Sequence, residues 1–372
     1  MVLPAGLAMD HGSSALRMRL LTNCDVDAIV GIDNHRGIFP IHRSVRFVLV
    51  TASAGLPTRE IACRMGLDDL ADLEAIGEQP ADTSTWFPVR VTPALLEHVS
   101  GPGLAIPSIR TATDLAIAER AASLFRPLGS RTGWAAVFGR ELNATDDRAA
   151  FRASSGHGSV VDGNRARRSD SGRVRLQPDS LPVVEGKHVE PFRAALDAVA
   201  YTIAAADAQR RLRSDRHHHP RLAYRDVAGA SNKLTLIAAV LPAGCVSTHT
   251  VFCLRTALSL QAQHFLCALF NSLVVNYLVR LRVSTHVTTA IVERLPLPTR
   301  EQAPAAFDGL AALARILARK ADPGAFAQLN ALVAELYQLS RAEFEHVLST
   351  FPLVPQQERE AALRVFAERA QR

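Results

Sequence analysis

Basic side chains that can contact phosphates or base edges are spread over the middle of this chain. A guanidinium group can bind a phosphate or a guanine edge with two hydrogen bonds, which a lysine ammonium cannot copy. The candidates for such contacts are Arg140, Arg148, Lys187, Arg225 and Lys233. Each of them can equally be a solvated surface charge, and Arg225 can form an internal ion pair with the adjacent Asp226.

Two polar inserts carry further arginines. Residues 152–180 are rich in Ser, Gly, Asp and Arg, and residues 207–221 contain Arg210, Arg211 and the triplet His217–His219. Neither insert shows hydrophobic periodicity, so both are predicted to be loops. Basic loops gain phosphate affinity by releasing counterions, which makes Arg210 and Arg211 candidates for non-specific phosphate contacts. The alternative is that both loops only make the protein more soluble.

Metal-dependent chemistry is disfavoured by the spacing of the possible ligands. Paired carboxylates can hold Mg²⁺ in nucleases, and Glu141, Asp146, Asp147 and Glu185 are the acidic residues to consider. Their spacing does not match the PD-(D/E)xK nuclease pattern. The three histidines His217–His219 point in different directions along an extended loop, so an exposed loop is predicted there rather than a metal site.

The composition is that of a folded, basic protein. The chain has 372 residues, a formal net charge of +6 and a hydrophobic fraction of 48%, which favours a polyanionic partner and several cores. Its five cysteines form no CxxC pair, so we expect reduced thiols and a cytoplasmic location. The most apolar stretch, 265–281, is interrupted by Asn271, Ser272 and Asn276, which predicts a buried helix and no membrane partner.

The first third of the chain reads as a mixed α/β region. Val2–Leu7 is predicted to be a buried strand, and 25–50 two further strands around the turn Asp33–Gly37. The apolar run Val45–Val50 is typical of a strand covered on both faces. Because these strands come with no partners before them, we expect the back half of an α/β domain. The other elements expected up to residue 135 are helices at 16–21, 56–76 and 111–125 and a strand at 86–91.

The remainder is predicted to be an α+β block followed by helices. Strands are expected at 222–227, 234–241 and 246–254, and one long amphipathic helix at 257–281. From Glu301 onward the apolar spacing is helical, and Ser340–Glu343 is a capping box. We expect this tail to pack back on the preceding block. The predicted fold class is therefore α/β, of the mixed α+β kind.

Several of these segments, taken in order, resemble the Eco57I-type N6-adenine DNA methyltransferases, including type IIG restriction-modification enzymes. Two segments look like the last strands of that methyltransferase domain: Val2–Pro4 through Leu16-Arg17, and Gly37–Pro40 with Ser44–Leu49. Two later segments resemble the start of the family's TaqI-like specificity region, namely Phe138–Arg148 and Leu181–Phe192. Further matches are Tyr224–Val227, Asn271-Ser272 and Leu295–Pro298. The resemblance covers nearly the whole chain and depends on the order and spacing of these pieces.

The resemblance implies a chemistry that this chain carries only in part. The family transfers a methyl group from S-adenosylmethionine to adenine N6, using an Asn/Asp-Pro-Pro-Tyr/Phe motif and a Gly-rich loop. The chain has no Pro-Pro dipeptide and no such loop, so the expectation is that it binds no cofactor alone and is inactive in isolation. One element of the family's site falls on Phe39, whose ring would stack on an adenine flipped out of the duplex. A core anchor at a strand start is the alternative for Phe39.

The implied organisation has four parts. The last strands of a Rossmann-like methyltransferase sheet occupy 1–55, a connecting region 56–135, a target-recognition domain 136–299 and a helical tail 300–372. The expected partners are double-stranded DNA and a separate N-terminal methyltransferase chain. A non-catalytic specificity subunit and an inactive gene remnant are the alternatives.

Overall fold

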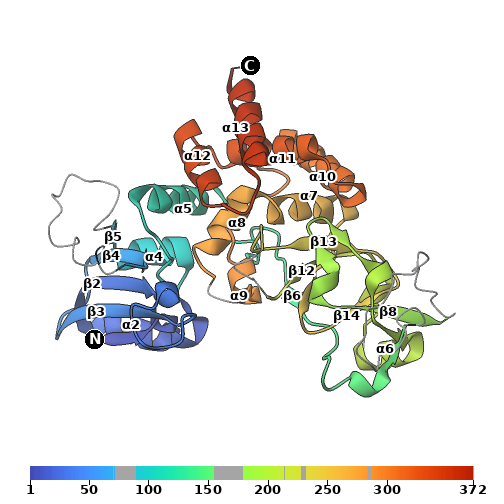
Figure 1. Ribbon diagram of the computed structural model, residues 1–372, viewed down its shortest axis with the longest axis horizontal. Coiled ribbons are helices and arrows are strands. Elements are labelled where there is room, and N and C mark those ends of the chain that lie inside the picture. Colours follow the sequence, from blue (N-terminus) through green and yellow to red (C-terminus); the bar gives the residue numbers. More distant parts are fainter. Residues whose placement is uncertain are drawn as a thin grey trace.

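The fold is mixed α/β, with several small sheets held together by helices (Figure 1). The computed structural model describes residues 1–69, 71, 89–154, 179–212, 214–227, 232–283 and 286–371. Within these residues there are a five-stranded sheet, two four-stranded sheets and a two-stranded ribbon. Figure 1 shows the five-stranded sheet on one side, the four-stranded sheets on the other, and the C-terminal helices above and between them.

The N-terminal sheet has the strand order β1-β3-β2-β4-β5. Its strands are β1 (Val2–Pro4), β2 (Cys24–Asp33), β3 (Arg46–Ala54), β4 (Ile61–Leu67) and β5 (Val89–Val91). The strands around the turn at Asp33–Gly37 are confirmed, and the strand predicted at 86–91 is confirmed for residues 89–91, since residues 86–88 lie outside the described residues. The prediction of a buried first strand is wrong, because β1 lies at the edge of the sheet and Val2 is 63% exposed.

The predicted helix at 56–76 is also wrong over its first half, where the chain forms β4. Ile61, Cys63, Met65 and Leu67 are all buried, and this period of two fits a strand. β4 pairs in parallel with β2 and antiparallel with β5. The sheet that was expected within residues 1–55 thus takes in two strands from the following region.

Four helices accompany this sheet. They are α1 (Gly6–Met9), α2 (Ser14–Asn23), α4 (Pro93–Ser100) and α5 (Ala112–Leu124). Leu7, Leu21 and Leu96 from three of them join Ile29 and Val50 of the sheet in one core. The predicted helices at 16–21 and 111–125 are confirmed. Thr111 caps α5 through a capping box with Asp114.

The described residues from Phe138 onward form a second body. Its short strands belong to two four-stranded sheets and a ribbon. The first sheet contains β13 (Ala238–Leu241), β12 (Arg221–Arg225), β15 (Val251–Leu254) and β6 (Phe138–Gly139). The second contains β14 (Val246–Ser247), β8 (Ser180–Val184), β11 (Tyr201–Ala204) and β7 (Phe151–Ala153). The ribbon pairs β9 (Val189–Glu190) with β10 (Arg193–Ala194). The single strand predicted at 246–254 is thus two strands, and they belong to different sheets.

The long apolar helix predicted at 257–281 is broken into α7 (Leu260–Phe270) and α8 (Leu273–Arg280). The side chain of Asn271 accepts a hydrogen bond from Ala238 N at 3.1 Å and donates one to Ala238 O at 2.8 Å. Ser272 then caps α8 by accepting from Val275 N. The two hydrogen bonds of Asn271 thus join the break between the helices to β13. No single described helix is long and apolar enough to span a bilayer, although α7 and α8 together pass that test with a bend of 64°.

The C-terminal tail is helical, as predicted. It contains α10 (Pro304–Arg319), α11 (Pro323–Leu336), α12 (Arg341–Ser349) and α13 (Gln356–Ala370), and it follows the short α9 (Thr289–Val292). Phe307, Leu329 and Phe344 of the tail share one core with Phe265 and Leu278 of α7 and α8. The tail therefore covers the face of α7 and α8 that the sheets leave free.

Candidate nucleic-acid interface

The N-terminal sheet directs one edge toward the second body. β1, β2 and β4 run in the same direction, since β3 is antiparallel to β1 and β2 and β4 is parallel to β2. Their carboxyl ends therefore meet at one edge, the usual place for a ligand site in an open α/β sheet. A cavity of about 480 Å³ lies along this edge, and a second one of about 380 Å³ lies beside the segment from Met9 to Arg17 that follows β1. Both are also lined by residues of the second body.

Phe39 lies at the same edge, in the loop between β2 and β3. The buried Asn34 holds this loop: its side-chain oxygen accepts from Phe39 N at 2.8 Å, and its amide donates to Phe39 O at 3.2 Å. The ring of Phe39 is 39% exposed and packs edge-to-face on Phe47, with 4.8 Å between ring centroids. Phe47 lines the larger cavity. Phe39 is thus a partly exposed ring on a fixed backbone rather than a fully buried core anchor.

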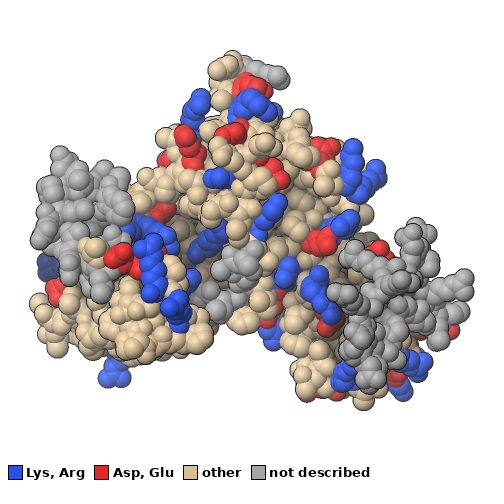
Figure 2. All heavy atoms as spheres, viewed as in Figure 1, with Lys and Arg blue, Asp and Glu red and all other residues tan. Residues whose placement is uncertain are grey.

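Arginines line both cavities. Arg46, Arg110 and Arg280 border the larger one, and Arg17, Arg282 and Arg294 the smaller one. Arg280 donates to the carbonyls of Thr350 and Lys233 and to Thr235 Oγ1. Burial lowers the pKa of the Arg280 and Arg282 guanidinium groups to about 10, which leaves both charged at neutral pH. Figure 2 shows Lys and Arg side chains on both walls of the hollow between the two bodies.

One predicted contact residue, Arg140, belongs to a charged cluster on the second body's wall. Its guanidinium lies 3.0 Å from the Asp226 carboxylate and 4.9 Å from the Phe252 ring centroid, and its side chain is 50% exposed. Asp226 also lies 3.3 Å from His286, which lines the smaller cavity. Asp226 thus pairs with Arg140 and not with Arg225, the partner considered as an alternative from the sequence. Arg225 itself is half-buried in β12.

The other predicted residues are not brought together with Arg140. Arg148 lies over the Tyr201 ring at 4.1 Å and donates to its hydroxyl. Lys187 pairs with Glu185 at 2.9 Å, and Lys233 lies 4.0 Å from Glu358. Arg210 pairs with Asp207, and Arg211 with Asp147 at 2.6 Å. These are mostly exposed positions on separate elements.

The loop prediction for residues 207–221 is wrong in two respects. Residues 205–212 form helix α6 (Ala205–Leu212), whose Ala208 is buried against β8 and β11. His217 is only 1% exposed, so the prediction of an exposed loop is wrong for the first histidine of the triplet, whereas His218 and His219 are exposed as predicted. This first histidine fills a buried position beside Arg221 instead of facing solvent. Most of the other basic insert, residues 155–178 with Arg165 to Arg175, lies outside the described residues.

Glu141, considered above as a metal ligand, is an internal ion-pair partner. Its carboxylate receives two hydrogen bonds from Arg221, at 2.7 and 2.8 Å, and two from Ser247 N and Oγ. Burial opposes its ionisation, but Arg221 and Ser247 hold the pKa of the carboxyl below its usual value. In the part of the chain that the structure describes, no group of three acidic, histidine or cysteine side chains could hold a metal ion.

The solved structures that resemble this chain include two restriction enzymes. No family model matches the chain, and no curated protein matches it. The type IIL restriction-modification enzyme MmeI, in complex with DNA, superposes with a TM-score of 0.45 and 8% identity over 100% of this chain and 49% of that one. The type IIG restriction endonuclease BpuSI does so with a TM-score of 0.36 and 12% identity, over 98% and 46%. The chain spans about half the length of each.

Proposed function

We propose that this chain is the DNA-binding and target-recognising part of an adenine-specific DNA methyltransferase in a restriction-modification system. The observation that carries the proposal is the arginine-lined hollow at the carboxyl edge of the N-terminal sheet, with the exposed Phe39 ring on the same edge. A duplex in this hollow would meet positive charge on both walls. The segments that resemble the Eco57I-type enzymes supply the Phe39 loop and Arg140, which lie on opposite walls.

The methyl donor of such an enzyme would bind elsewhere. S-adenosylmethionine carries a positive sulfonium, and both cavities are lined by three arginines each. Neither the Gly-rich loop nor the Pro-Pro motif that would hold the cofactor and the adenine occurs in the sequence. The residues present therefore do not fit this cofactor, and we infer that another part of the enzyme binds it.

Duplex DNA should bind with a steep salt dependence. If about six phosphates are contacted, the affinity should fall by about a thousandfold between 50 and 200 mM salt. Fluorescence anisotropy with a labelled duplex of mixed sequence measures this, and calorimetry with S-adenosylmethionine alone should give no binding heat. Absence of duplex binding at 50 mM salt would reject the proposal. Adenine methylation on mixing with a chain that carries the missing motif would distinguish a split enzyme from a specificity subunit.

Phe39 should contribute to binding through its flat ring. Stacking of a base on an aromatic side chain contributes about 1–3 kcal/mol, so Phe39→Ala should weaken binding of single-stranded DNA containing 2-aminopurine by about tenfold. Quenching of the base's fluorescence reports the stacking directly. Phe39→Leu keeps an apolar side chain without a ring, and Phe39→Trp keeps the ring. If the Leu variant quenches as well as the wild type, the ring has only a packing role. Ile41→Ala, at a 50% exposed position of the same loop, is the matched control.

A further inference from the structure

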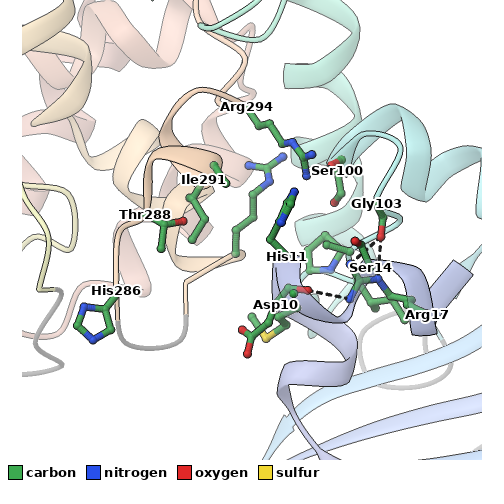
Figure 3. A pocket seen from close by; sticks show the side chains of 17 residues that line it. Asp10, His11, Ser14, Arg17, Ser100, Gly103, His286, Thr288, Ile291 and Arg294 are labelled. Carbon is green, nitrogen blue, oxygen red and sulfur yellow. Dashed lines mark hydrogen bonds between the residues drawn. The ribbon is translucent and has the colours of Figure 1, made fainter. Parts of the chain in front are cut away.

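The smaller cavity collects three arginines from three separate elements. Arg17 comes from α2, Arg282 follows α8, and Arg294 follows α9. A Cβ atom placed on Gly103 would lie 3.7 Å from Arg294 Nη1 and 3.8 Å from Arg17 Nη2, so these two groups reach the same spot. Figure 3 shows Arg294 and Arg17 entering from different sides, with His11 between them and the Asp10 carboxylate pointing away.

These guanidinium groups are bound only by neutral oxygens. Arg17 is 2% exposed and donates to the carbonyls of Leu7 and Gly103, at 2.6 to 2.8 Å, and more weakly to Asp10 O. Arg282 donates to the carbonyls of Leu278 and Val99, and Arg294 to that of Ser100. Carbonyls satisfy N–H donors but cancel no charge. Among the described residues, no carboxylate pairs with any of the three.

Two polar groups at the cavity have no hydrogen-bond partner among the described residues. Ser100 is 4% exposed, and its hydroxyl makes no hydrogen bond to any described residue. The buried Nε of Arg282 is likewise without an acceptor in the described part of the chain. Leaving such groups unpaired is unfavourable, and an acceptor in the cavity could satisfy them. Burial lowers the pKa of the Arg17 guanidinium, which the nearby Asp10 charge opposes and the Arg294 charge reinforces; burial and Arg294 likewise lower the pKa of Arg282.

We propose that this cavity is a binding site for a phosphate group, held by Arg17, Arg282, Arg294 and the hydroxyl of Ser100. A phosphate offers several acceptor oxygens and negative charge, and guanidinium groups bind it with paired N–H bonds. At about 380 Å³ the cavity has the size of a small-molecule site. The group can come from a DNA backbone phosphodiester in the hollow or from a free phosphate compound. The site itself does not depend on the proposed DNA function.

The first test is the unfolding midpoint of the full chain in inorganic phosphate, compared with chloride at equal ionic strength. A ligand that binds the folded state raises Tm, so Tm should rise with phosphate concentration. The phosphate affinity obtained from this response should be at least about tenfold lower in Arg294→Gln than in the wild type. The affinity of Arg294→Lys should lie between those of the wild type and Arg294→Gln. Arg131→Gln, at an exposed arginine away from the cavity, is the matched control and should respond like the wild type. An equal Tm in phosphate and chloride overturns the proposal.

Ser100→Ala gives a second readout that a purely structural role would not produce. Without phosphate the variant should be as stable as the wild type or more so, because a buried unpaired hydroxyl is removed. In phosphate its Tm should rise less than that of the wild type. A phosphate response unchanged in both Ser100→Ala and Arg294→Gln contradicts the assignment to this cavity.

Competition between inorganic phosphate and duplex DNA distinguishes the two possible sources of the phosphate group. If inorganic phosphate at constant ionic strength displaces the duplex, and Arg294→Gln weakens duplex binding, the occupant is a backbone phosphate. If duplex and phosphate bind together, the occupant is a free phosphate compound. A chain that binds phosphate but no duplex keeps this site and rejects only the DNA function.

Discussion

Replacing Glu141 with alanine should lower the free energy of unfolding by about 3–5 kcal/mol, because it leaves the buried Arg221 charge without its partner. Both side chains are nearly inaccessible, at 2% and 4% exposure, and the two hydrogen bonds between them are 2.7 and 2.8 Å long. The variant also removes the acceptor for Ser247 N and Oγ. Urea unfolding followed by circular dichroism would measure the loss.

Two further variants show whether the effect comes from the buried charge. Glu190→Ala breaks an ion pair with Arg193 whose partners are 46% and 57% exposed, so it should cost no more than about 1 kcal/mol. Adding Arg221→Met to a Glu141→Leu variant removes the unpaired buried charge. The double variant should therefore regain part of the stability that Glu141→Leu alone loses. A Glu141→Ala cost no larger than that of Glu190→Ala would contradict the prediction.

The Glu141–Arg221 pair also matters for the proposed interface. Arg221 begins β12 of one four-stranded sheet, while Ser247 lies in β14 of the other, so Glu141 ties the two sheets together. The adjacent residue, Arg140, is the predicted contact that lies on the wall of the hollow. Because the Glu141 side chain is held inside the protein by these hydrogen bonds, the preceding residue Arg140 faces outward, toward the hollow.

Helices with clear apolar periodicity were predictable from the sequence. The helix at 111–125 and the C-terminal tail were found because their apolar residues repeat with a helical period, and within the tail Ser340–Glu343 was recognisable as a capping box. The strands on either side of Asp33–Gly37 were predicted from short apolar runs that flank a turn sequence. In each case the local pattern and the tertiary environment favour the same element.

The failures occur where distant contacts decide the local structure. The 257–281 stripe is continuous as a helical pattern, and only the fit of Asn271 to the backbone of Ala238 breaks it. Similarly, Ile61–Leu67 was assigned to a helix because acidic residues follow it, whereas its pairing with β2 and β5 makes it a strand. The burial of His217 was missed because three consecutive histidines have no amphipathic pattern.

Candidate site residues were harder to predict, since a charge pattern does not show which charges remain without a counterion. Arg210 and Arg211 were selected from a basic run, yet each pairs with a carboxylate. Arg17, Arg282 and Arg294 were not selected, because they lie in apolar or mixed segments and not in the polar inserts. The only signal for Arg282 and Arg294 was an arginine beside a strongly apolar stretch. Their convergence follows from the packing of the two bodies.

Replacing Asp114 with alanine should cost about 3–5 kcal/mol, because four donors lose one buried acceptor. The Asp114 side chain, 4% exposed, accepts from the backbone N of Arg110 and of Thr111, from the Tyr277 hydroxyl at 2.5 Å and from His346 Nε2 at 2.7 Å. It thereby joins the start of α5 to α8 and α12. Asp308→Ala, at an exposed helical aspartate, should cost far less.

Acid should remove the contribution of the Asp114 charge. Burial alone would raise the pKa of the Asp114 carboxyl, but the hydrogen bonds from His346 and Tyr277 and from two backbone amides hold it below its ordinary value of 3.8. A folded-state pKa below the unfolded one stabilises the protein above about pH 4 and loses that effect as pH falls through the folded value. The stability difference between wild type and Asp114→Asn, measured by urea unfolding, should therefore shrink from pH 7 to pH 3. An equal difference at both pH values would show that Asp114 acts through packing and not through its charge.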